Sequence, residues 1–258
     1  MDKKEEKQGN HGEHIIELHN ISKYYHMGHS VVKALDDVDI HIKKGDFIAI
    51  MGPSGSGKST SMNLVGSLDL ATKGAIYLDG INIEHLGESE LAQIRGKKIG
   101  FIFQQFNLIP NLTAKENVML PMMFQDIDEE DRIKRGEHLL NLVGLGDRME
   151  HYPGQLSGGQ QQRVAIARAL ANDPEVILAD EPTGNLDTKT GEHVMDFLQE
   201  LNKKGKTIIV VTHSPELAHQ HAKIIYWLKD GKIEKVTKKV GRSWVDVKAF
   251  KTPLDKRR

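Results

Sequence analysis

Residues 52–60 form a glycine-rich segment that constrains the rest of the chain more than any other stretch. The segment matches the pattern G-x-x-x-x-G-K-[ST] with the residues Gly52, Pro53, Ser54, Gly55, Ser56, Gly57, Lys58, Ser59 and Thr60. An apolar run of strand length, 47–51, precedes it, and the proline-free run 59–68 can continue as a helix. A turn of this kind points successive backbone N–H groups and a helix N-terminus at an anion. The sequence therefore predicts a phosphate-binding loop.

Two side chains of this loop have a predicted chemical role. Lys58 supplies a mobile positive charge for the outer phosphates, and the hydroxyl of Ser59 is placed to ligate Mg²⁺. The alternative is a glycine-rich turn that binds nothing, and the flanking strand and helix argue against it. We therefore expect the chain to bind a nucleoside triphosphate together with Mg²⁺.

Composition limits the size of the molecule and excludes several classes of function. The 258 residues can bury one substantial core with a smaller lobe attached. The net charge is −1, so no overall basic field indicates a nucleic-acid partner. Because the chain has no cysteine, disulfides and cysteine-ligated metals are excluded, which is compatible with a reducing cytoplasm. Since no apolar run reaches about 18 residues and residues 1–7 are charged, we expect neither a membrane span nor a secretory signal.

The chain has thirteen histidines, which are scattered along its length. Several of them lie near the start, at His11, His14, His19, His26 and His29. None of them pairs at the spacing of a zinc motif, so we do not expect histidine to ligate a metal here.

Apolar runs of strand length alternate with runs of helical composition. Strands are expected at 15–18, 38–42, 47–51, 76–78, 99–103, 176–179 and 207–211, with a terminal hairpin at 224–228 and 232–233. Helices are expected at 59–68, 88–95, 128–143, 158–171 and 191–201, and two more begin at the capping residues Thr113 and Ser214. The continuous apolar run 176–179 suits a parallel strand covered on both faces. This alternation predicts an α/β fold with a mostly parallel sheet.

The apolar run 176–179 ends in two acids, Asp180 and Glu181. Asp180 fits a residue that holds Mg²⁺ through water, opposite Ser59. Glu181 stands one position further on, where a carboxylate could polarise an attacking water as a general base. A strand that simply ends in a solvated acidic loop is the alternative, and the phosphate loop upstream weighs against it. The pair predicts hydrolysis of the bound nucleotide.

A second anion-facing helix start is expected where the serine side chain and the following amides open the helix 158–171. Its residues are Leu156, Ser157, Gly158, Gly159 and Gln160. This pentapeptide is a complete match to the signature motif of ABC transporter ATP-binding subunits, and the chain resembles that family over about residues 15–235. The resemblance implies a P-loop NTPase core with an N-terminal antiparallel β layer and an inserted α-helical subdomain. It also implies that two subunits pack head to tail, with this motif on the γ-phosphate bound to the partner's phosphate loop.

The resemblance assigns roles to further residues. Gln104 resembles the glutamine that senses Mg²⁺ and the attacking water and links to the membrane partner. Asp187, in the run 184–187, resembles the aspartate that reaches across the dimer. His213 resembles the switch histidine that contacts the γ-phosphate and Glu181. An aromatic residue stacks on adenine in this family, and Tyr25 is the preferred candidate, with Tyr24 as the alternative.

A finer resemblance rests on the segments 32–38, 103–110 and 181–187. Together they are similar to the macrolide-export and lipoprotein-release branch of the family. That branch works with integral membrane permeases that have large extracytoplasmic domains. The resemblance therefore implies ATP and Mg²⁺ as cofactors, a homodimer, and a cytoplasmic location on the inner face of the membrane through the permease. Export, lipoprotein release and transmembrane signalling all stay open.

The expected organisation has three parts. Residues 1–13 form a flexible N-terminus, and 14–235 form the ATPase domain with a helical subdomain at about 86–165. Residues 236–258 form a basic tail that is either solvated or attracted to an anionic membrane surface. The methionine-rich segment 119–124 is either a plain core helix or an adaptable apolar groove for the permease.

Two other classes of ATPase compete with a transporter subunit. Soluble ABC proteins of DNA repair or translation carry a long coiled coil between the motif halves or two cassettes in one chain, and this chain has neither. A regulator that couples ATP to a membrane partner without transport cannot be separated from an exporter by sequence, because the permease selects the cargo.

Overall fold

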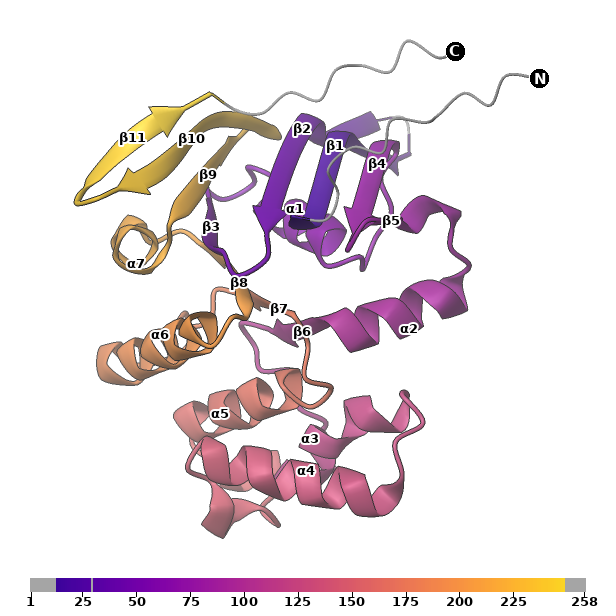
Figure 1. The fold of residues 1–258 in the computed structure, drawn as a ribbon, viewed down its shortest axis with the longest axis vertical. Helices are drawn as coiled ribbons and strands as arrows, with labels where there is room; N and C mark the ends of the chain where they lie inside the picture. The colour runs from indigo at the N-terminus through magenta and orange to yellow at the C-terminus, as the bar shows by residue number, and fades with distance from the viewer. Residues whose placement is uncertain (1–12, 29, 249–258) are drawn as a thin grey trace.

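The computed structural model describes residues 13–28 and 30–248, which form two β-sheets with α-helices between and around them (Figure 1). The first sheet is antiparallel, with strand order β2-β1-β4-β5. Its strands are β1 (His14–Met27), β2 (Ser30–Lys43), β4 (Lys73–Leu78) and β5 (Ile81–Asn82). Alternate residues of β1, such as Ile16 and Leu18, turn one face of this sheet into the core.

The second sheet is mixed, with strand order β11-β10-β9-β3-β8-β7-β6. Five strands run parallel: β3 (Phe47–Met51), β6 (Ile99–Ile102), β7 (Val176–Asp180), β8 (Thr207–Thr212) and β9 (Ile224–Lys229). At one edge β10 (Lys232–Val240) and β11 (Ser243–Val247) continue the sheet in antiparallel fashion. The carboxyl ends of the parallel strands therefore meet at one edge, where the loops that follow β3, β6, β7 and β8 can meet.

The parallel strands are apolar throughout because both of their faces are covered. Helix α1 (Lys58–Val65) lies between the two sheets, and its Met62 and Leu64 pack with Ile48 and Ile50 of β3. On the opposite face of β3, Phe47 and every second residue after it pack into the other core. The period of two residues along β3 thus divides the interior into two cores.

Six further α-helices complete the described chain. They are α2 (Glu88–Lys98), α3 (Ala114–Met123), α4 (Glu129–Leu142), α5 (Gly158–Ala169), α6 (Thr188–Lys203) and α7 (Pro215–His221). Three short 3-10 helices lie at Ile83–His85, Gly146–Arg148 and Pro153–Gln155. Helices α3, α4 and α5 form a lobe at the bottom of Figure 1, and α6 and α7 cover the second sheet beside it.

The predicted fold class is confirmed, and so are the caps at Thr113 and Ser214, whose side chains accept hydrogen bonds from the Glu116 and Leu217 amides. Two expected boundaries are wrong. The range 86–165 contains β6, which pairs with β7 inside the second sheet, so the helical lobe begins only after that strand. Residues 236–240 and 243–247 belong to β10 and β11 rather than to a tail, because Val236 and Thr237 are buried against β9. The expected flexible N-terminus and the last ten residues lie outside the described chain, apart from Glu13.

Candidate active site

The phosphate loop joins the buried strand β3 to α1 with a geometry that only glycine allows at two positions. Gly57 caps α1 in the left-handed region, with φ at 99°, and a Cβ there would lie 2.5 Å from the carbonyl oxygen of Ala34. A Cβ on Gly52 would lie 2.2 Å from the carbonyl oxygen of Leu228. The backbone therefore has the close approach and the turned amides that a phosphate cradle needs.

Two polar groups of the loop have the chemistry to meet phosphate. The Lys58 ammonium donates hydrogen bonds to the carbonyl oxygens of Gly52 and Pro53, at 2.8 and 2.9 Å. These acceptors are neutral, so a phosphate oxygen would be a stronger partner for the same ammonium. The hydroxyl of Ser56 is buried and has no hydrogen-bond partner within the described chain. The residues present therefore fit a bound phosphate chain.

Asp180 ends β7 at the same edge of the sheet as the phosphate loop, and it is partly buried. Burial raises the pKa of its carboxyl, the charge of Glu181 raises it further, and the charge of Lys58 opposes the rise. Lys58 is thus close enough to act on Asp180, which brings the lysine and this acid into one site. The Asp180 carboxylate and the Ser59 hydroxyl are both oxygen ligands of the kind that Mg²⁺ prefers.

Glu181 and His213 are in direct contact. The Glu181 carboxylate oxygen Oε1 lies 2.8 Å from His213 Nδ1, and its Oε2 lies 3.5 Å from the Thr212 hydroxyl. Neighbouring parallel strands create this contact, since Asp180 of β7 pairs with Val211 of β8. The Glu181 backbone has a φ of 44° and donates its N–H to the Val211 carbonyl. The structure therefore brings together the predicted base and the predicted switch histidine.

Gln104 follows β6 and contacts the loop after Glu181. Its carbonyl oxygen accepts a hydrogen bond from the Asn185 side chain at 2.7 Å. A Cβ built on Gly184 would lie 3.0 Å from its side-chain nitrogen, so the amide lies against that loop. Gln104 is thus positioned near the acidic pair by the neighbouring strand, as strand order β7-β6 requires.

The signature residues 157–160 form the expected helix start. Ser157 caps α5, and its hydroxyl accepts a hydrogen bond from the Gln160 amide while the Gln160 side chain accepts one from the Ser157 amide. Gly158 is exposed at the first turn. Within the described ranges, no hydrogen bond or ion pair joins 157–160 to the phosphate loop 52–60 of the same chain.

Asp187 caps α6 beside the signature segment. Its carboxylate accepts hydrogen bonds from the amide and the hydroxyl of Thr190, at 3.0 and 2.6 Å, and these bonds lower its pKa. A Cβ on Gly159 would lie 2.9 Å from the Thr190 side chain. The exposed Asp187 and the exposed start of α5 are therefore neighbours on one surface.

The two candidate adenine-stacking tyrosines lie in different surroundings on β1. Tyr25 is exposed, donates its hydroxyl to Asp69 at 3.1 Å, and has the Lys23 ammonium 5.2 Å from its ring centre. Tyr24 is less exposed, with the ammonium groups of Lys33 and Lys73 within 6 Å of its ring. The greater exposure of its ring keeps Tyr25 the preferred prediction.

Two residues of α5 link the site together and were not singled out from the sequence. The Arg168 guanidinium donates to the carbonyl oxygens of Phe106 and Asn107, just after Gln104. The fully buried Gln162 donates to the carbonyl of Pro182, just after Glu181. Both partners are distant in sequence, so no local pattern indicated these contacts.

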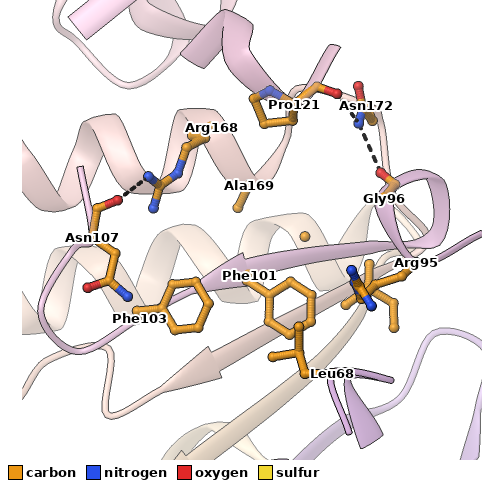
Figure 2. A pocket seen from close by; sticks show the side chains of 12 residues that line it. Leu68, Arg95, Gly96, Phe101, Phe103, Asn107, Pro121, Arg168, Ala169 and Asn172 are labelled. Atoms are coloured by element: carbon orange, nitrogen blue, oxygen red, sulfur yellow. Dashed lines mark hydrogen bonds between the residues drawn. The ribbon is translucent and has the colours of Figure 1, made fainter. Parts of the chain in front are cut away.

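An apolar cavity of about 260 Å³ lies beside the Gln104 loop, lined by Phe101, Phe103, Arg168 and residues of α2 and α3 (Figure 2). A second cavity, of about 490 Å³, continues from it along α2 and α3 and ends at the exposed ring of Phe124. In the methionine-rich segment 119–124, Met122 is in the core while Phe124 lines the second cavity, and a groove for the permease stays a prediction.

Comparisons with known proteins agree with this geometry. The family model of the ABC transporter matches residues 35–184. The ABC transporter ATP-binding protein MJ0796 of Methanocaldococcus jannaschii is 54% identical over 229 residues, which cover 87% of this chain and 97% of that protein. A solved dimeric structure of MJ0796 in a post-hydrolysis state, bound to ADP and Pi, matches with a TM-score of 0.82 at 51% identity and covers 88% of this chain and 99% of that one.

The chain is also 49% identical over 225 residues to the macrolide export ATP-binding/permease protein MacB of Aggregatibacter actinomycetemcomitans. These 225 residues cover 87% of this chain and 35% of that protein. Among the described residues, none of the helices has the length and apolar character needed to cross a membrane. On these matches, and on the motifs gathered at the ends of β3, β6, β7 and β8, the chain belongs to the ABC transporter ATP-binding family.

Proposed function

We propose that this chain is the ATP-hydrolysing subunit of an ABC transporter, which closes as a head-to-tail dimer on ATP and drives a separate permease. The observation that carries the proposal is the contact of 2.8 Å between the Glu181 carboxylate and His213. This contact lies at the strand edge that also bears the phosphate loop. A carboxylate held there has the orientation to accept a proton from water that attacks the terminal phosphate.

Each residue of the site has a role in this proposal. The amides of the phosphate loop and the Lys58 ammonium hold the phosphates, and Ser59 and Asp180 hold Mg²⁺ with the help of Gln104. The metal, when bound, neutralises charge on the phosphate oxygens. Glu181 takes the proton from the attacking water, and His213 fixes the orientation of that carboxylate. Tyr25 stacks on the adenine ring.

The proposed site is completed by a second copy of the chain. The signature residues 157–160 make no polar contact with their own phosphate loop within the described residues, although their helix start is built to face an anion. In a head-to-tail dimer they would face the nucleotide on the partner, with Asp187 beside them. The dimeric structure of MJ0796 bound to ADP and Pi supports this arrangement.

The permease is proposed to dock on the groove formed by the two cavities along α2 and α3. The groove is apolar, ends at the exposed Phe124, and shares Arg168 with the loop after Gln104. Docking there would place the subunit on the inner face of the cell membrane. The likeness to MacB supports a permease of that branch and an export-type function.

Hydrolysis is tested by replacing Glu181 with glutamine. The amide cannot accept the proton from water, so we expect E181Q to lose about 10²–10⁴-fold in the rate of ATP hydrolysis. The measurement is phosphate release by the purified protein with ATP and Mg²⁺. The control is E130Q, at an exposed glutamate of α4, which should keep the rate of the unaltered protein. Normal turnover in E181Q would remove Glu181 from the role of general base.

A further inference from the structure

Three histidines surround one glutamate on the outer face of the first sheet. Glu17 and His19 are two residues apart on β1, so their side chains leave the same face of the strand. His41 on β2 is the cross-strand partner of Glu17. An irregularity of register between His14 and Ile16 brings His14 to the same group. None of the four residues belongs to the proposed nucleotide site.

The nitrogen atoms of these imidazoles converge on a single carboxylate oxygen. Glu17 Oε2 lies 3.1 Å from His19 Nε2, 3.5 Å from His41 Nδ1 and 4.0 Å from His14 Nδ1. One donor atom from each of Glu17, His19 and His41 lies within 4.8 Å of the other two. The rings are also neighbours, with that of His41 centred 5.1 Å from His19 and 5.6 Å from His14.

Two of these separations are close to those of ligands around a small ion. A tetrahedral ion with bonds of about 2.0–2.1 Å holds its ligand atoms about 3.3 Å apart. The distances from Glu17 to His19 and to His41 lie on either side of that value. Small side-chain movements would therefore be enough to bring these atoms to the positions of metal ligands.

The chemistry of the group favours a transition metal over Mg²⁺. Imidazole is a ligand for ions such as Zn²⁺, Ni²⁺ and Cu²⁺, whereas Mg²⁺ prefers oxygen alone. Glu17 and His41 are largely buried, so a cation bound by them would be partly shielded from water.

We propose that Glu17, His19 and His41, with His14 as a fourth ligand, form a binding site for a divalent transition-metal ion of the Zn²⁺ type. An ion bound there would link β1 to β2. The site lies on β1 away from Tyr25, the residue predicted to stack on adenine. The sequence did not indicate this site, because its ligands come from two strands and follow no zinc-motif spacing.

The proposal is tested by titrating Co²⁺, and then Zn²⁺, into the untagged full-length protein. The protein is first treated with chelator and kept free of nucleotide, with Mg²⁺ in excess so that oxygen-only sites are filled. We expect one equivalent of Co²⁺ to bind and to give the intense visible absorption of a four-coordinate ion, which Zn²⁺ then displaces. Weak, octahedral absorption with no defined stoichiometry would overturn the proposal.

Variants assign the binding to this cluster. We expect H19Q and H41Q each to lower the Co²⁺ affinity at least about tenfold, since even the loss of a residue supporting a ligand costs 10–100-fold. H138Q and H193Q are the matched controls, because these histidines are exposed on α4 and α6. They should bind Co²⁺ like the unaltered protein. Unchanged binding by the double variant H19Q/H41Q would overturn the proposal.

A stability measurement keeps the test decisive if one variant folds poorly. We expect Zn²⁺ to raise the melting temperature of the unaltered protein and of H138Q, since an ion that binds only the folded state stabilises it. Zn²⁺ should not raise the melting temperature of H19Q. His19 is more exposed than His41, so H19Q should fold better than H41Q. An equal increase in H19Q and H138Q would contradict the assignment.

Discussion

At the scale of single residues, Asp180 and Glu181 are neighbours in sequence that meet different partners. The charge of Lys58 acts on the pKa of Asp180, whereas the Glu181 carboxylate contacts Thr212 and His213. Glu181 has a positive φ of 44° directly after the end of β7, where the regular strand geometry stops. Two identical charges can therefore take two roles, one toward a metal and one toward water.

His221 is a single residue that should make folding stability depend on pH. This histidine is buried at the end of α7, where it stacks on Phe47 with the ring centres 6.3 Å apart. Burial lowers its pKa, Asp196 opposes that change, and Lys239 adds to it. The unfolded chain therefore binds a proton below about pH 6.5 that the folded chain excludes, and folding stability falls as the pH decreases through that range.

Replacing His221 with leucine should remove this contribution. We expect the free energy of unfolding of H221L, measured with urea, to decrease less between pH 7 and pH 5 than that of the unaltered protein. H193Q, at an exposed histidine of α6, should keep the original pH dependence. The same pH dependence in H221L and in the unaltered protein would show that His221 does not titrate on unfolding.

The residue identities of the site could be predicted from sequence, whereas several of their contacts could not. Gly52, Lys58 and Glu181 are recognisable because a phosphate loop and an acidic strand end have fixed spacing. The contact from Asn185 to Gln104 depends on the order β7-β6 in the sheet, which no local spacing encodes. The choice between Tyr24 and Tyr25 stays a prediction, because it depends on the position of a bound base.

At the scale of elements, α5 connects the two halves of the molecule. Its first turn carries the signature residues, its middle holds the loop after Glu181 through Gln162, and its end holds the loop after Gln104 through Arg168. Figure 2 shows Arg168 reaching the Asn107 carbonyl at the edge of the apolar cavity. Phe106 and Asn107 both have left-handed backbones, with φ of 57° and 50°, so this loop needs external support.

Removing the Arg168 guanidinium should release that loop. We expect R168M to lose about 1.5–3 kcal/mol of stability, the usual contribution of a hydrogen bond to a charged group. We also expect faster amide hydrogen exchange in residues 104–108, measured by mass spectrometry. R168K keeps the charge but not the fork of donors, so it should recover only part of the protection. Unchanged exchange in R168M would contradict a supporting role for this side chain.

Elements with a clear period were predictable, and the edge of the second sheet was not. The parallel strands are recognisable because burial on both faces requires continuous apolar runs. Strand β10 carries exposed lysines such as Lys238 and Lys239, so its sequence is that of a basic tail although these residues pair with β11. The buried Val236 was too weak a signal to override that composition.

At the scale of the whole molecule, the proposed arrangement gives one chain two halves of different nucleotide sites. The phosphate loop and the acidic pair lie at the strand ends of the second sheet, and the signature residues lie at the start of α5 in the helical lobe (Figure 1). A dimer with head-to-tail symmetry would pair each half with its complement in the partner. ATP would then act as the adhesive between subunits, and hydrolysis would let them separate.

The molar mass of E181Q in solution, measured by light scattering with ATP and Mg²⁺, tests this half-site arrangement most directly. We expect the mass of two chains with ATP and of one chain with ADP, because the variant binds ATP without consuming it. Adding S157R, which places a bulky charge at the signature helix, should keep the ATP-bound protein at the mass of one chain. A single-chain mass for E181Q at saturating ATP would contradict the proposed dimer.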